Sequence, residues 1–228
     1  MAQPNHSWSH HMNRRTSVSL ASLAFAVTLG TGLPLQAAQS SPQHGHAPAA
    51  APLSAAQTQD ALRDLWVGHV FWVRNVALET IAGNGAAAKA AEEQVVANAR
   101  QIADAIEPFY GKAASDKLFG LLAGHYGAVK EYLVAKGTAA QNAAWKKLAA
   151  NAEEIAVFLS GANPNLPVDT LRSLLIAHGG HHVQQIKQLR DKDYKGEAQT
   201  WESMKQHMYV IADALTGAIA KQFPAKFG

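Results

Sequence analysis

The chain has no cysteine among its 228 residues, and this absence excludes several kinds of chemistry. Without thiols there are no disulfides, no thiolate metal ligands, no cysteine nucleophile and no covalently attached haem. Charge is also sparse, because only 16% of the residues are charged and the formal net charge is +3. Such a small excess gives no electrostatic reason to expect binding to nucleic acid or to an anionic membrane. Any chemistry must come from histidines, carboxylates, amides or hydroxyls.

Residues 1–37 have the features of a secretory signal peptide. Arg14 and Arg15 supply a basic start, an apolar stretch follows over 18–35, and small residues come next. Ser, Thr, Gly and Pro interrupt the apolar stretch, so a membrane-spanning helix is a poor alternative. Met12 directly precedes this pattern and is an alternative translation start. We expect cleavage near residue 37 and a periplasmic or secreted protein that is not held in the membrane after cleavage.

Residues 38–56 are rich in Pro, Ala, Gln and Ser, which predicts a flexible linker. The linker contains His44 and His46, and three further histidines, His6, His10 and His11, precede Met12. Loose capture of metal by the linker pair is one interpretation, and a chance pair in a flexible segment is the other. We place the folded domain within residues 57–224 and look for a specific site there.

From Ser54 onward the apolar residues recur at helical spacing, and glycine and proline interrupt the pattern. These features predict an all-α protein. The predicted helices span 57–82, 86–107, 114–136, 139–160, 168–190 and 198–222. Thr138 and Gln141 have the spacing of a capping box at the start of the fourth helix.

The six predicted helices form three similar pairs. In the first helix of each pair a histidine follows leucines seven and four positions earlier, and these histidines are His69, His125 and His178. The aligned polar residues of the second helices are Asn98, Asn151 and His207. A repeat of about 54 residues therefore occurs three times, and it predicts a six-helix bundle made of three repeated helical hairpins.

These polar residues share a helix face with the apolar residues, so we expect them to point inward. Burying an imidazole or a carboxamide without a partner costs about 1 to 3 kcal/mol, so they must bind one another, water or a ligand. Neutral imidazoles suit Zn, Cu, Ni and Fe. The candidate metal ligands are His69, His125, His178 and His207. We expect Asn98 and Asn151 to orient the rings by hydrogen bonds.

The segment HGGHH at 178–182 adds two further candidate ligands. His178 and His182 lie on one helix face and can chelate an ion together, and His181 is adjacent. The alternative is that His181 and His182 are an ordinary pair facing solvent. A zinc protease needs a glutamate after the first histidine, and Gly179 replaces it. The two glycines each weaken the helix by about 1 kcal/mol, which indicates close helix packing or a local distortion.

Three interpretations of the inward histidines remain open. The first is a transition-metal site for storage, buffering or delivery. The second is a structural or interaction protein whose buried His/Asn network specifies the fold, and the third is a site for a small organic ligand. We find no carboxylate set for a di-iron centre, no phosphate-binding loop and no catalytic triad. The sequence therefore predicts no catalytic residue and no nucleotide cofactor, and it identifies no protein partner.

Arg74 is expected to extend to the surface, with pairing to a buried carboxylate as the alternative.

Several motifs in residues 57–224 resemble a family of small bacterial helical proteins of unknown function. They are LWVGHVFWVR (65–74), EPFYG (107–111), NAEEIAVFLS (151–160), NP (163–164) and QFP (222–224). The resemblance implies a helical repeat fold. Members of the family are often labelled glycosyltransferase or acetylglutamate kinase, which implies a transferase-type enzyme as an alternative function. The resemblance implies no site residues.

Changing both Arg14 and Arg15 to Glu should abolish export, because the signal peptide then loses its positive start. Cell fractionation with detection of the cleaved and uncleaved chains measures the effect. The matched control replaces both residues by Lys and should be exported normally. Export of the Glu variant would contradict the prediction.

Overall fold

The computed structural model describes residues 53–228, and the predicted signal peptide 1–37 and most of the linker lie outside them. The long helices of this part are α1 (Ala55–Ile81), α2 (Gly85–Asp104), α4 (Lys112–Val134), α5 (Thr138–Ala162), α6 (Val168–Arg190) and α7 (Tyr194–Gln222). Two short elements are α3 (Glu107–Tyr110) and the 3-10 helix η1 (Pro224–Lys226). Residues 53–228 contain no strand, which confirms the all-α prediction for them. No helix in this range is long and apolar enough to cross a membrane.

Capping explains where the helices depart from the predicted boundaries. Helix α1 begins two residues earlier than predicted because Ser54 and Gln57 form a capping box. The Ser54 hydroxyl accepts from the Gln57 amide at 3.2 Å, and the Gln57 side chain accepts from the Ser54 amide at 2.9 Å. The capping box predicted at Thr138 is wrong. Gly137, with φ of 82°, is the N-cap of α5, so Thr138 is already the first helical residue.

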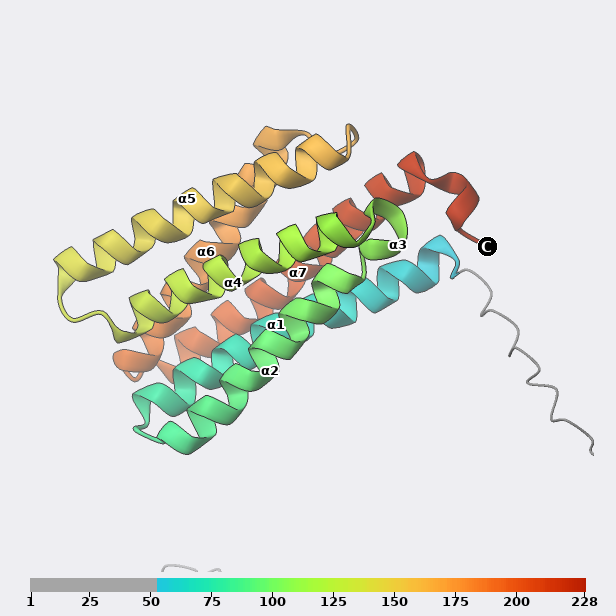
Figure 1. Ribbon diagram of the computed structural model, residues 1–228. Coiled ribbons are helices and arrows are strands. Elements are labelled where there is room, and N and C mark those ends of the chain that lie inside the picture. The colour runs from blue at the N-terminus through green and yellow to red at the C-terminus, as the bar shows by residue number, and fades with distance from the viewer. Residues whose placement is uncertain (1–52) are drawn as a thin grey trace, which may run out of the picture. The chain divides into compact units, whose positions relative to one another are not determined.

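Each long helix packs against the next long helix along the chain (Figure 1). Helix α1 packs on α2, α4 packs on α5, and α6 packs on α7. Contacts of α1 with α7, of α5 with α6 and of α2 with α4 join these pairs. Helix α6 also contacts α1 and α4, so it touches both of the other helices that carry an aligned histidine.

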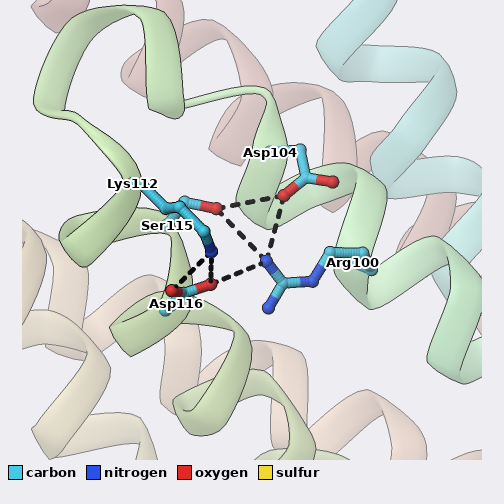
Figure 2. A network of polar contacts seen from close by, with 5 residues as sticks. All are labelled: Arg100, Asp104, Lys112, Ser115 and Asp116. Atoms are coloured by element: carbon cyan, nitrogen blue, oxygen red, sulfur yellow. Dashed lines mark hydrogen bonds and ion pairs between the residues drawn. The ribbon is translucent and has the colours of Figure 1, made fainter.

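A polar network fixes the junction between α2 and α4 (Figure 2). The Arg100 guanidinium donates to Asp104 on its own helix and to Asp116 on α4, both at 3.1 Å. Ser115 is fully buried and its hydroxyl donates to Asp104 at 3.1 Å. Lys112 donates to Asp116 at 2.7 Å. Because the ion pairs are largely solvated they add little stability, and their effect is to set the register of the two helices.

The buried apolar side chains form two clusters. One includes Trp66, Leu122 and Leu175, and the other includes Val73, Val129 and Ile186. On each of α1, α4 and α6 the buried histidines lie between a residue of the first cluster and a residue of the second. The core therefore consists of two apolar regions with a layer of histidines between them.

The glycine pair of α6 provides a direct test of helix packing. A Cβ on Gly179 would lie 3.2 Å from Leu148 Cδ2, which confirms a close approach of α5 and α6 there, whereas a Cβ on Gly180 would meet nothing within 4 Å. Gly180→Ala should therefore raise the free energy of unfolding by about 0.5 to 1 kcal/mol through helix propensity alone. Gly179→Ala should gain less or lose stability, because the buried Leu148 must move. Urea unfolding of both variants measures this, and equal gains would contradict the packing.

Candidate metal centre

Four histidines from three helices meet in the layer between the apolar clusters. They are His69 on α1, His125 on α4, and His178 and His182 on α6, one turn apart. One ring nitrogen of each lies within 4.8 Å of a ring nitrogen of every other. The four side chains are 1–3% exposed, so the group is closed to solvent. We call these residues the four-histidine group.

His178 is the best connected member of the four-histidine group. Its ring centroid lies 4.6 Å from that of His182, 5.2 Å from that of His125 and 5.7 Å from that of His69. Nitrogen ligands about 2.1 Å from a tetrahedral ion lie about 3.4 Å apart, so separations of up to 4.8 Å would have to shorten by up to about 1.4 Å. Coordination of one ion by all four rings would therefore draw the rings closer together.

The ring nitrogens of the group make almost no hydrogen bonds. Both nitrogens of His69, His125 and His178, and Nε2 of His182, are buried without a hydrogen-bond partner among residues 53–228. A structural network would pair these donors and acceptors with one another or with neighbouring side chains. The observed convergence of unpaired nitrogens on one point is the arrangement that a bound cation would satisfy.

Burial keeps the four-histidine group neutral. Burial, with a smaller effect of His125, lowers the pKa of His69 to about 3. Burial lowers the pKa of His125 to about 4, and the nearby Asn151 side chain opposes that change. Burial and then the neighbouring histidines lower the pKa values of His178 and His182 well below the usual range. The rings are therefore neutral at pH 7, which is the form that binds a metal.

The three aligned polar residues of the second helices make one common contact. Asn98 Nδ2 donates to the Leu65 carbonyl and Asn151 Nδ2 donates to the Leu121 carbonyl, each at 3.0 Å. The Nε2 of His207 lies 2.8 Å from the Leu174 carbonyl. In each case the carbonyl belongs to the residue four positions before the aligned histidine. This contact thus joins neighbouring helices one turn before each of the three aligned histidines.

Small residues make room for this contact. A Cβ on Gly68 would lie 3.2 Å from Asn98 Nδ2, and a Cβ on Gly124 would lie 3.1 Å from Asn151 Nδ2. Both glycines directly precede a histidine of the group. An alanine at either position would require the carboxamide to shift by a few tenths of an ångström.

The structure brings together some of the predicted ligands and not others. His69, His125 and His178 converge, and His182 joins them from the next turn of α6. His207 is outside the group, because its ring is directed to the Leu174 carbonyl in the manner of Asn98 and Asn151. His181 is half-buried and lies next to His207 instead, with ring centroids 5.5 Å apart. The linker histidines His44 and His46 lie outside the described residues. The spacing of four between His178 and His182 was the sequence signal for the fourth member.

A half-buried ion pair, whose carboxylate the sequence did not identify, joins α1 to α7. Arg74, five residues after His69, donates from Nε and Nη2 to the two oxygens of Glu197 at 2.6 Å. Glu197 has a side chain that is only 3% exposed, and Gln185 also donates to it at 3.1 Å. The expected surface position of Arg74 is therefore wrong, and the alternative of a buried carboxylate partner is correct. Glu197 gave no signal in the sequence because it lies alone in the first turn of α7.

The stability of the metal-free protein should fall with acid. In the unfolded chain histidine titrates near 6.5, but in the fold the pKa values of His69 and His125 are about 3 and about 4. Between these values the unfolded chain binds more protons, so stability is present above about pH 6.5 and is lost as the pH falls. Each such histidine contributes a slope of up to about 1.4 kcal/mol per pH unit. Urea unfolding at pH 7, 6 and 5 in chelator-treated buffer measures this, and constant stability would contradict neutral burial.

Comparison with known proteins adds no functional assignment. The chain matches no protein-family model, no curated protein and no solved structure at the significance required. The transferase-type activity that the sequence motifs suggested therefore gains no support from these comparisons. The four-histidine group itself is the feature from which a function has to be inferred.

Proposed function

We propose that the protein binds one transition-metal ion through His69, His125, His178 and His182. The observation that supports this most directly is the convergence of their unpaired, buried nitrogens within 4.8 Å. An unpaired buried polar group costs about 1 to 3 kcal/mol, and several such groups in one layer are a large penalty. Coordination to one ion would satisfy a nitrogen on each of four rings simultaneously.

The ligand type indicates which ions fit. Neutral imidazoles bind Zn²⁺, Cu, Ni²⁺ and Fe²⁺ well, whereas Mg²⁺ and Ca²⁺ prefer oxygen ligands. Four protein ligands complete a tetrahedral shell and leave no open position for substrate. The proposed site is therefore suited to holding an ion, for storage, buffering or delivery, and not to catalysis.

Asn98 and Asn151 are suited to support such a site. A ring that gives one nitrogen to a metal carries hydrogen on the other, and that hydrogen requires an acceptor. The Oδ1 atoms of both asparagines are buried without a partner in the described part of the chain. Asn151 is close enough to His125 to affect its pKa. We therefore propose that Asn151 accepts from His125 when the ion is bound.

We also propose that the bundle consists of three copies of one helical hairpin and that the protein is exported. The shared contact of Asn98, Asn151 and His207 with a backbone carbonyl supports three copies of one helical hairpin. Export rests on the N-terminal sequence alone. In an exported protein the ion would be acquired outside the cytoplasm.

The first experiment measures metal content and affinity. Untagged protein purified without chelators should contain about one ion per chain, and removing the ion should lower the melting temperature. Changing both His125 and His178 to Ala should abolish specific binding. Asn151→Ala should weaken binding by about 10- to 100-fold, as is usual for residues that orient metal ligands. Elemental analysis and equilibrium titration measure these effects. A parent whose melting temperature is unchanged by chelator would contradict the proposal.

His182→Val distinguishes metal binding from a purely structural layer. Val73 and Val129 are buried at the aligned positions of α1 and α4, so valine is compatible with this place in the helix. If the group binds metal, the variant should lose affinity while the metal-free protein becomes as stable or more stable, because a buried unpaired ring is removed. A structural network predicts the reverse, with loss of stability in metal-free buffer. His181→Ala, adjacent but outside the group, is the matched control and should retain the equilibrium affinity.

A further inference from the structure

Outside the four-histidine group, His181 and His207 form a second pair of imidazoles on α6 and α7. Their ring centroids are 5.5 Å apart with an angle of 56° between the rings. Both side chains are half-buried, in contrast to the closed group beside them. His181 directly precedes His182 in the sequence, and His207 is near enough to His178 to contribute to the lowering of its pKa. We call His181 and His207 the outer pair.

The hydrogen bond of His207 leaves a metal-binding nitrogen free. A backbone carbonyl only accepts, so the Nε2 that lies 2.8 Å from the Leu174 carbonyl must carry the hydrogen. In the neutral ring the lone pair is then on Nδ1. A ring held by a carbonyl through one nitrogen and offering the other is the usual arrangement of a metal-binding histidine.

Helices α6 and α7 differ from the other two helical hairpins at the positions of His181 and His207. The position of His207 is occupied by Asn98 and Asn151 in the other two, and a carboxamide is sufficient for the contact with the carbonyl. The position of His181 is occupied by Trp72 on α1 and by Ala128 on α4. Neither imidazole is therefore required by the packing that these positions share. Their occurrence together on one pair of helices, in contact, needs another explanation.

A polar hollow connects His181 of the outer pair with the surface. It lies between α6 and α7, has a volume of ≈ 160 Å³ and is lined by His181, Gln184, Gln199 and Ser203 among others. All of its lining residues are polar or glycine, so a hydrated ion can reach His181 along a mainly polar surface. The four-histidine group, at 1–3% exposure, has no such access of its own.

We infer that the outer pair is a second, weaker metal site that captures a divalent transition-metal ion from solution and passes it to the four-histidine group. The inference rests on the proposed function for its second half, the transfer. Transfer is ligand exchange: the two outer imidazoles and water leave the ion as the four inner imidazoles bind, and no electron moves. An ion held beside the group has a far higher effective concentration there than a free ion at micromolar levels.

The test uses Co²⁺, whose visible absorption is strong in a tetrahedral nitrogen site and weak in a six-coordinate site with water. All proteins carry His44→Ala and His46→Ala so that the linker does not contribute. The test variant is His181→Ala with His207→Asn, which are the residues at the aligned positions of α4 and α5. The asparagine should retain the contact with the Leu174 carbonyl, and an unchanged unfolding curve checks that it does. Gln184→Ala, a change in the hollow without loss of an imidazole, is the control.

The parent should bind one Co²⁺ with strong absorption and a second, weaker one with little absorption. The test variant should retain the strong signal at equilibrium, lose the weaker ion and load at least about 10-fold more slowly at micromolar Co²⁺ in stopped-flow measurements. The control should load as the parent does. Loading of the test variant at the parent's rate, or persistence of the weaker ion, would overturn the inference.

Failure of the proposed function gives a different result. A parent without the strong absorption contradicts the four-histidine site and the transfer. If that parent still binds the weaker ion, and the variant with His181→Ala and His207→Asn does not, the outer pair is supported as a metal site in its own right. Absence of any such ion in that parent would overturn the outer site as well.

Discussion

The layer of four buried imidazoles is the feature on which the rest of the bundle depends. Each ring carries a donor and an acceptor, and within residues 53–228 almost all of these nitrogens lack a hydrogen-bond partner. At about 1 to 3 kcal/mol for an unpaired polar group, the layer is costly for a domain whose total stability is typically about 5 to 15 kcal/mol. The apolar clusters on both sides of the layer must offset this cost. The fold is therefore organised to hold these rings in place against their own tendency to be hydrated.

Backbone contacts hold the helices at the required separation. Asn98, Asn151 and His207 each bind a carbonyl one turn before a histidine of the layer, and glycine next to two of those histidines lets the helices approach. These contacts use the Nδ2 atom of each asparagine, while its Oδ1 atom is buried in the interior. Each asparagine thus spaces two helices and keeps a second, unpaired oxygen buried in the described part of the chain.

The electrostatics of the region favour a neutral protein environment for the proposed ion. Burial keeps the imidazoles uncharged, and Arg74 and Glu197 neutralise one another through two short hydrogen bonds. The Glu197 hydrogen bonds raise the pKa of Arg74, so its guanidinium remains charged over the whole range in which the histidines change charge. Because the Glu197 side chain is 3% exposed, removal of Arg74 would leave its carboxylate buried without the cation, which is destabilising. This pair therefore contributes to a defined packing of α1, α6 and α7 around the layer.

The sequence by itself determined the helical class, the inward direction of the histidines and the alignment of three of them, because helical periodicity records which face is buried. It also contained the spacing that adds His182. It could not distinguish His182 from His207 as the fourth member, since both lie on apolar stripes and only the rotation of neighbouring helices decides which ring reaches the centre. The partner of Arg74 and the contact between His181 and His207 also depend on this rotation, because they join residues on different helices. Periodicity fixes the face of one helix, whereas the meeting of faces from several helices is decided only by how their side chains pack together.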